Sequence, residues 1–262
     1  MIIGKTKLPR ITACIFTLLT FSFLYVPLVV LIIFSFNTNK FPGNWDAFTL
    51  KWYKELFCSQ KLWSSFFTSL TVSLISAFMS LFMGILLLYF KIHGGNIRKT
   101  IPLFYANLLI PESLVAISLL SFFSFFEIPL GLTTLIIAHT VLGLGFTIPI
   151  LYSRFKQFDK RQMEASLSLG ATTKQTFYRI VLPFMKPAIL AASLLVFILS
   201  FDDFILSYFT AGTNVETLSL YLLSMLRTGI SPIVNALSAF ILILSCLLVM
   251  FFYSPKIRSK VF

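Results

Sequence analysis

The sequence predicts an all-α membrane protein with six membrane-spanning helices. Of its 262 residues, 58% are hydrophobic and only 11% are charged, whereas soluble domains carry about 25% charged residues. A soluble domain with so few charges could not cover its surface with polar groups. The composition also excludes a disordered chain and a soluble nucleic-acid binder. We therefore expect membrane lipid, and no nucleic acid, around this protein.

Six apolar stretches carry this prediction, since a helix crosses a bilayer with roughly 20 apolar residues. We expect residues 1–262 to form a single transmembrane domain, because the connections are too short to fold alone. The stretches run at about 11–36, 64–90, 101–126, 130–152, 187–209 and 232–253.

The first stretch follows three basic residues, Lys5, Lys7 and Arg10, as a signal peptide would. A signal peptide has an apolar core of roughly 7–15 residues, however, and this run is much longer. No small-residue cleavage site follows it, so we interpret it as an uncleaved anchor. Only residues 127–131 separate the third and fourth stretches, which predicts a tight turn.

The distribution of positive charge predicts the orientation, because Lys and Arg gather in cytoplasmic loops. With six spans, the N-terminus, the second and fourth loops and the C-terminus share one side of the membrane. The other side holds only 5 of the 21 basic residues, namely Lys40, Lys51, Lys54, Lys61 and Arg227. Both termini are therefore predicted to be cytoplasmic.

Two connections on the predicted outer side are longer than turns. Residues 37–63 contain a short helical pattern that Thr49 can cap. The tryptophan and tyrosine side chains there suit the level of the lipid headgroups. Two interpretations stay open, a helix lying on the outer membrane face and a docking surface for an external partner, and they can coexist. The second connection is about 210–231, where Ser231 caps and Pro232 opens the last span.

The predicted fourth loop, at about 153–186, has an internal pattern of two short helices. Asp159 can cap a helix that continues to Leu169. Gly170 then breaks this helix, since glycine tolerates positive φ. Thr172 or Thr173 can cap a second helix, which we expect to run to about Leu182 and to stop at Pro183. The pattern predicts a helix, a glycine turn and a second helix, packed against the membrane.

The spacing inside this loop resembles the EAA motif of the permease subunits of ABC importers. The chain departs from that motif once, with Ser166 in place of its second alanine, and serine is also small. The motif precedes the fifth of the six predicted spans. Its landmarks in this chain are Glu164, Ala165, Ser166, Gly170, Ile180, Leu182 and Pro183.

Short matches along nearly the whole chain resemble a narrower group, the permeases of spermidine/putrescine importers. They support this group more specifically than the EAA motif, which importers of many substrates share. In chain order the matches are Tyr25–Pro27, Ser35–Asn37, Thr49–Tyr53, Pro111–Glu112, Ala116–Leu120, Tyr152–Arg154, Ser200–Asp203 and Ser231–Leu237.

The resemblance implies the type I ABC importer permease fold, a location in the bacterial cytoplasmic (inner) membrane and a set of partners. These are a second, homologous permease chain, two ATPase subunits and an extracytoplasmic polyamine-binding protein. The chain has no Gly-rich phosphate loop, so ATP and Mg²⁺ are expected on the ATPase and no cofactor on this chain. Glu164 is the residue that we expect at the ATPase contact. Its alternative role is to favour the start of its own helix.

Three carboxylates within predicted spans are the candidates for the substrate path, because a charge inside a bilayer is costly and usually functional. Asp202 and Asp203 are expected in the outer half of their span, and Glu112 near the midplane beside a kink at Pro111. A path for linear polycations needs carboxylates and aromatic faces. The alternative is structural: a carboxylate can cap a broken helix or pair with a basic residue of the partner permease.

His139, in the middle of its span, is expected to be hydrogen-bonded within the packing rather than part of a proton relay. We find no nucleophile–base pair and no metal-ligand cluster at helical spacing, so neither catalysis nor a metal site is predicted. Two rival functions remain open. One is a permease of the same fold for another small solute or metal cation, and the other is a proton-coupled secondary transporter.

Overall fold

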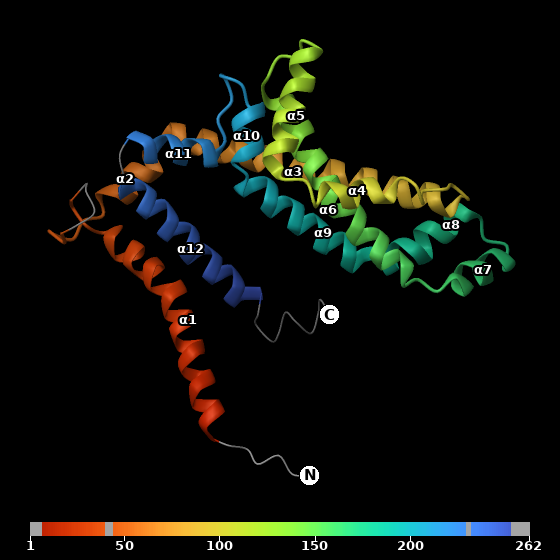
Figure 1. The fold of residues 1–262 in the computed structure, drawn as a ribbon, viewed down its shortest axis with the longest axis horizontal. Coiled ribbons are helices and arrows are strands. Elements are labelled where there is room, and N and C mark those ends of the chain that lie inside the picture. Colours follow the sequence, from red (N-terminus) through yellow and green to blue (C-terminus); the bar gives the residue numbers. More distant parts are fainter. Residues whose placement is uncertain (1–6, 40–43, 229–231, 253–262) are drawn as a thin grey trace. The chain divides into compact units, whose positions relative to one another are not determined.

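The computed structural model describes residues 7–39, 44–228 and 232–252 of the chain. These described residues fall into two compact units, the first with 7–39, 44–60, 222–228 and 232–252 and the second with 61–221. Within the described ranges every regular element is a helix, and the one β-bridge joins Asn37 and Phe48 (Figure 1). The predicted all-α class is therefore confirmed.

The first unit contains α1 (Lys7–Phe34), α2 (Lys51–Cys58) and α12 (Pro232–Phe252). The α1 side chains from Thr12 onward are mostly exposed in the isolated chain, as in Phe23, which is 82% exposed. A helix that is apolar all round and unburied by protein is suited to lipid. The last span begins at Pro232 as predicted, whereas the predicted cap Ser231 lies outside the described residues.

The short helix α2 is bound to the turn that follows α1. The Trp52 indole N–H donates to the Asn37 carbonyl oxygen at 2.7 Å, and the Tyr53 and Ser35 hydroxyl groups lie 2.8 Å apart. Trp52 is buried within this unit, so its indole ring is surrounded by protein side chains. The Thr49 hydroxyl accepts the Lys51 N–H at 3.1 Å, although the N-cap position itself belongs to Leu50.

The second unit contains the remaining long helices. In Figure 1, α3 (Gln60–Ile92), α6 (Leu132–Lys156) and α9 (Leu182–Asp202) run beside one another. The shorter elements are α4 (Ile101–Asn107), α5 (Glu112–Phe125), α7 (Lys160–Ser168), α8 (Thr173–Thr176), the π-helical turn η1 (Phe177–Val181), α10 (Ile205–Thr210) and the first residues of α11 (Leu218–Thr228).

Within the described residues, four helical segments are long and apolar enough to cross a membrane. They are Thr12–Phe34, Gln60–Ile92, Leu132–Lys156 and Thr173–Asp202. A fifth candidate is the pair α4 and α5, which is bent by 110°. The sixth predicted stretch corresponds to α12. The six-span prediction is consistent with these helices.

Two predicted spans differ from the structure because backbone breaks interrupt them. The third stretch is divided at 108–111, where Pro111 adopts extended backbone (φ −55°, ψ 133°) and Glu112 begins a new helix. Proline has no N–H to continue the helix, so the predicted kink is a full break. The fifth stretch ends as a helix at Asp202, and α10 follows after Asp203 and Phe204.

Small residues allow the long helices of the second unit to pack closely. A Cβ atom on Gly84 would lie 3.0 Å from Leu151 and Thr147, and one on Gly143 would lie 2.7 Å from Val196. Such small residues let helix backbones approach each other in membrane proteins. The face of α3 buried here is also rich in serine, with Ser65, Ser69, Ser73, Ser76 and Ser80 all buried.

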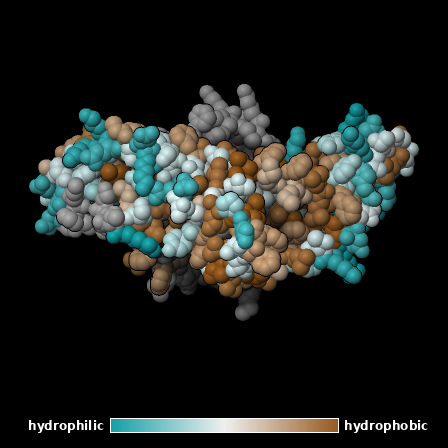
Figure 2. Space-filling model, turned by 90° about the horizontal axis from the view of Figure 1, so that it is seen from above, coloured by the Kyte–Doolittle hydropathy of each residue, from teal (hydrophilic) through white to brown (hydrophobic). Residues whose placement is uncertain are grey.

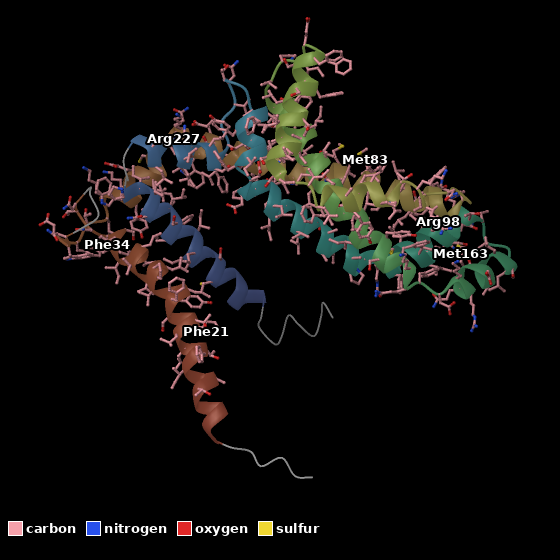
Figure 3. All side chains as sticks on the ribbon, viewed as in Figure 1. Phe21, Phe34, Met83, Arg98, Met163 and Arg227 are labelled. Atoms are coloured by element: carbon pink, nitrogen blue, oxygen red, sulfur yellow. The ribbon has the colours of Figure 1, made fainter. Side chains whose placement is uncertain are left out.

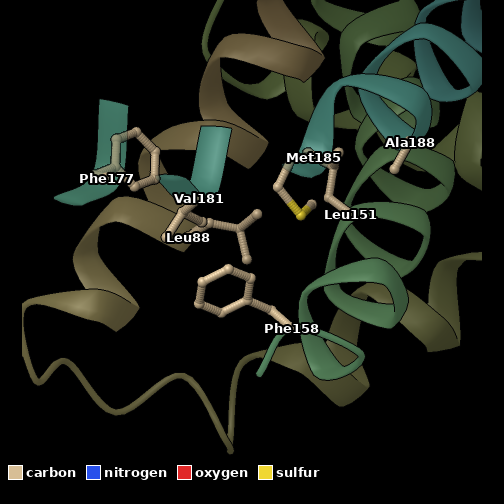
Figure 4. Packing of buried hydrophobic residues seen from close by; sticks show 7 residues of the cluster. All are labelled: Leu88, Leu151, Phe158, Phe177, Val181, Met185 and Ala188. Carbon is tan, nitrogen blue, oxygen red and sulfur yellow. The ribbon is translucent and has the colours of Figure 1, made fainter. Parts of the chain in front are cut away.

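Residues 157–172, which contain α7, connect α6 to α8, and we call them the α7 turn. One apolar cluster lies where α3, α6 and α9 meet this turn (Figure 4). It brings together side chains distant in sequence, and the partly buried Ile180 and Leu182 pack against it. This cluster anchors the segment that carries the predicted motif. Its buried members are Leu88, Leu151, Phe158, Phe177, Val181, Met185 and Ala188.

Candidate functional site

The first candidate site is the turn around α7, and its start is formed as the sequence predicts. The Asp159 carboxylate accepts the Arg161 backbone N–H at 2.9 Å, which caps the helix. No α7 residue is fully buried, and within the helix only Met163 and Ser166 are half-buried while the other side chains are exposed. Glu164 and Ala165 are both exposed on it.

Gly170 ends this helical segment in a left-handed conformation. Its φ is +87°, which costs glycine little and other residues more. The Gly170 N–H donates to the Leu167 carbonyl oxygen, and the Ala171 N–H donates to the Ser166 carbonyl oxygen. This pair of hydrogen bonds is the Schellman motif that often ends helices. The predicted glycine break is therefore confirmed.

Ser166, the departure from the motif, makes a contact that alanine could not make. Its hydroxyl oxygen lies 2.9 Å from the Thr176 hydroxyl oxygen, and this hydrogen bond joins α7 to α8. Thr172 caps α8, and the Gln175 side chain accepts the Thr172 N–H in return. The two short helices are thus held by their own caps and by one bond between them.

The prediction that Pro183 stops the second helix is wrong. The chain continues as one helical segment from Thr173 to Asp202, with the π-helical turn η1 just before Pro183. Proline conflicts with the carbonyl group four residues earlier in a regular helix. In η1 the Leu182 N–H donates to the Phe177 carbonyl oxygen, and this wider turn accommodates the proline.

A groove lies between α7 and the helical segment that follows it. Leu169, which lines this groove, is 88% exposed. The motif residues therefore divide into two sets. Glu164 and Ala165 face outward, whereas Ile180 and Leu182 pack into the apolar cluster of Figure 4. The groove residues are Gln162, Ala165, Ser166, Leu169, Ala171, Gln175, Arg179 and Ile180.

The second candidate site is formed by the predicted intramembrane acids, which the structure places in different settings. Asp202 is the last residue of α9 and is exposed. Asp203 follows in extended backbone, and its side chain is only 2% exposed. The two acids, expected within one span, therefore do not belong to one helix, because α9 ends between them.

Asp203 caps the start of α10. Its carboxylate oxygens accept the Leu206 N–H at 3.3 Å and the Ser207 N–H at 2.9 Å. Its backbone carbonyl oxygen also accepts the Ser219 hydroxyl group. The structural alternative stated above, a carboxylate that caps a broken helix, describes this geometry.

His139 and Glu112 complete what we call the Asp203 cluster, defined as Glu112, His139, Ser200, Asp203 and Ser207. His139 is fully buried, with Nε2 at 3.5 Å from Asp203 Oδ2 and Nδ1 at 2.9 Å from Ser200 Oγ. Nε2 also lies 3.3 Å from Ser207 Oγ. The Glu112 carboxyl group lies close enough to the Asp203 carboxyl group for the two to interact electrostatically. The expectation that His139 is hydrogen-bonded within the packing is confirmed.

The Asp203 cluster joins two backbone breaks, because Glu112 begins α5 after the α4–α5 bend and Asp203 lies between α9 and α10. Packing holds the two breaks together, since Ala116 of α5 and Leu206 of α10 are buried in one cluster with Ala138 of α6. Sequence reasoning named both acids but did not connect them to His139. The sequence did offer one signal for this connection: His139 is an ionisable residue in the middle of an apolar stretch, and such residues usually pair with other polar groups.

The described residues contain no group of three or more His, Cys, Asp or Glu side chains that could hold a metal ion. Aromatic residues follow Asp203 in the chain, and the Phe204 ring packs on the Tyr208 ring. Such an arrangement suits organic cations, because aromatic faces attract positive charge.

Comparison with known proteins gives consistent results for sequence and structure. The family profile of the binding-protein-dependent transport system inner membrane component matches residues 99–256. The chain is 36% identical over 233 residues to the spermidine/putrescine transport system permease protein PotC of Escherichia coli strain K12, covering 87% of this chain and 88% of that protein. It is 31% identical over 234 residues to the putrescine transport system permease protein PotI of the same strain, covering 86% and 83%.

Solved structures share the fold at low sequence identity. A chain of a bacterial ABC transporter involved in alginate import superposes with a TM-score of 0.68 at 15% identity, with both chains fully covered. The MetNI methionine ABC transporter gives a TM-score of 0.57 at 18% identity over 80% of this chain and 98% of that chain. At these identities the likeness concerns the fold alone.

Proposed function

Because the chain belongs to the family of binding-protein-dependent transport system inner membrane components, we propose that it is a permease subunit of an ATP-driven polyamine importer. Its substrates would be spermidine and putrescine. The observation that carries this proposal is the 36% identity to a spermidine/putrescine permease over 87% of the chain. The chain would form half of the translocation path and leave ATP hydrolysis to a partner.

The energy source would be a separate ATPase, since this chain has no Gly-rich phosphate loop. ATP and Mg²⁺ would bind there, and this subunit would carry no cofactor of its own. Two ATPase subunits, a second and homologous permease chain and an external polyamine-binding protein would complete the assembly. The chain would lie in the bacterial inner membrane with both termini in the cytoplasm, as the distribution of Lys and Arg favours.

The α7 turn would be the contact with the ATPase. Its exposed face offers Glu164 and the apolar side chain of Leu169 to a partner. The landmarks Gly170, Ile180, Leu182 and Pro183 would give this turn its shape and fasten it to the membrane part. Proteins can switch between states by moving packed helices as rigid bodies. The helical segment Thr173–Asp202 would transmit such a movement from the α7 turn to Asp202.

The Asp203 cluster would lie on the path of the cation. The helical segment Thr173–Asp202 has 30 residues, which is about 45 Å at helical rise. It therefore runs from the α7 turn directly to Asp202 and Asp203. A change at the ATPase contact could alter the α9–α10 break and hence the position of both acids relative to Glu112.

The proposal is tested by uptake of labelled spermidine and putrescine into cells with the gene deleted and then restored. ATP depletion and collapse of the proton gradient are applied separately. We expect uptake to be lost on deletion, to return on restoration and to depend on ATP. Uptake that follows the proton gradient would overturn the importer, and unchanged polyamine uptake would reassign the permease to another solute or metal cation.

A further inference from the structure

A cavity of about 550 Å³ lies at the junction of α3, α6 and α7, and its lining residues differ from those of the groove beside α7 and of the Asp203 cluster. Three lysines line it, each from a different part of the chain: Lys91 near the end of α3, Lys156 at the end of α6 and Lys160 at the start of α7. The volume is in the range of ordinary ligand pockets, about 300–1,000 Å³.

The charge of this cavity is positive and not neutralised by the chain. No carboxylate lines it, and among the described residues none of the three lysines forms an ion pair. The Asp159 carboxylate, which precedes Lys160 in the chain, does not line the cavity and accepts the Arg161 backbone N–H as the cap of α7. Three ammonium groups around one hollow favour an anionic ligand.

The rest of the wall is apolar and aromatic. Tyr152, Phe155 and Met163 line the same cavity, and the Lys156 ammonium group lies 4.8 Å from the centre of the Tyr152 ring. A small inorganic anion would use the lysines and leave these side chains without a partner. A ligand with both an anionic group and a hydrocarbon part would use all of them.

The cavity also lies where a lipid headgroup would be found. The segments Gln60–Ile92 and Leu132–Lys156 are both apolar enough to cross a membrane, and Lys91 and Lys156 are at their ends. Figure 2 shows hydrophilic side chains gathered at the α7 end of the second unit, next to a hydrophobic surface. Figure 3 labels Met163 and Arg98 at this same end.

We propose that this cavity binds the headgroup of an anionic membrane phospholipid, with its phosphate on Lys91, Lys156 and Lys160 and its hydrocarbon chain along Tyr152, Phe155 and Met163. Basic pockets between membrane helices are suited to such headgroups. Lys160 and Met163 are three residues apart on α7 and thus share a face of it. A bound lipid therefore ties α7 to the ends of α3 and α6.

The test is native mass spectrometry of the complete transporter, purified with its partner subunits and titrated with phosphatidylglycerol or phosphatidylcholine. The variant is Lys91→Gln/Lys156→Gln/Lys160→Gln. The matched control, Lys99→Gln/Lys174→Gln/Lys186→Gln, removes the same charge from lysines that do not line the cavity. We expect the cavity variant to bind phosphatidylglycerol on the order of 100-fold more weakly, at about fivefold per lysine.

The control variant should retain the affinity of the wild type for phosphatidylglycerol, and phosphatidylcholine should bind weakly to all three proteins. Single variants, such as Lys156→Gln, give a graded loss of about fivefold and guard against a fold defect in the triple variant. Equal phosphatidylglycerol binding by the wild type and the cavity variant would overturn the proposal. Displacement of the lipid by millimolar inorganic phosphate would assign the cavity to a soluble anion instead, and would also overturn it.

Discussion

The α7 turn and the Asp203 cluster are built in opposite ways. The turn has no buried residue in α7 and is held by contacts between near neighbours, such as the Asp159 cap and the Gly170 turn. The Asp203 cluster is buried, and His139 reaches Ser200 and Ser207 across 61 and 68 residues of sequence. The difference shows that an exposed turn can be formed by contacts between near neighbours in sequence, whereas the buried polar side chains of the Asp203 cluster need partners from several helices.

The largest expected effect is that of Glu164→Lys on uptake. Glu164 is exposed on α7, so the substitution should leave folding intact while reversing the charge at the proposed ATPase contact. We expect polyamine uptake to be lost, and the measurement is uptake of labelled spermidine in cells that express each variant.

The control for Glu164→Lys is Glu55→Lys, which reverses an exposed carboxylate on α2. Glu55 pairs with Lys51 at 3.7 Å on the surface, and such pairs contribute about 0–1 kcal/mol. Its uptake should stay near that of the wild type. Normal uptake in Glu164→Lys would remove α7 from the coupling role.

The next effect is that of Asp203→Asn. Asparagine keeps an oxygen that can accept the Leu206 or Ser207 N–H but lacks the negative charge. We expect uptake to fall, because the proposed cation path loses a negative charge, and the fold to be destabilised by about 1.5–3 kcal/mol, because a backbone N–H loses a charged acceptor. Co-purification of the ATPase should be unchanged.

Asp202→Asn is the comparison for Asp203→Asn, because Asp202 is exposed and caps no helix in the structure. If Asp203→Asn transports like the wild type while Asp202→Asn does not, then the exposed acid serves the path and the buried one is purely a cap. That outcome would move the substrate site from Asp203 to Asp202.

A smaller effect is expected for Gly170→Ala. No heavy atom lies within 4 Å of the added Cβ, so the cost is purely that of positive φ, about 1–2 kcal/mol. We expect the α7 turn to loosen and uptake to fall, with thermal unfolding of the membrane part little changed. Gly131→Ala is the control, since Gly131 also has open space but extended backbone at φ 168°. Equal uptake by the two variants would contradict a role for the left-handed turn.

The smallest effect is expected for Ser166→Ala, which restores the second alanine of the motif. It removes the hydrogen bond to Thr176, which is worth about 0.5–1.5 kcal/mol. Hydrogen exchange of the α7 amides should become faster than in Ser168→Ala, which changes an exposed serine of the same helix. Identical exchange in the two variants would show that Ser166 does not hold α7 to α8.

The same contrast explains what the sequence could predict. The Asp159 cap and the end of α7 at Gly170 follow from residue types at fixed spacings and were predicted. For the cap of α8 the sequence left Thr172 and Thr173 open, and the structure has Thr172. The helix through Pro183 was not predicted, because the π-helical turn that accommodates it is fixed by packing of Phe177 and Val181 against α3 and α6.

For the Asp203 cluster the sequence identified the acids but not their arrangement. A break after Asp202 has no glycine or proline to announce it. The burial of Asp203 depends on His139 and on packing of Leu206 against α5 and α6. Such contacts join residues that only the folded chain brings together, and sequence spacing carries no signal for them.

The central claim is that Glu164 lies against the ATPase, and site-directed cross-linking tests it most directly. Glu164→Cys is introduced after Cys14, Cys58 and Cys246, all exposed in the structure, have been changed to serine. A short thiol-to-amine cross-linker is then applied to the complete transporter in membranes. We predict a cross-link from Cys at position 164 to the ATPase subunit that changes in yield when ATP is added. Cross-linking to the second permease alone, with the ATPase present and active, would contradict the account.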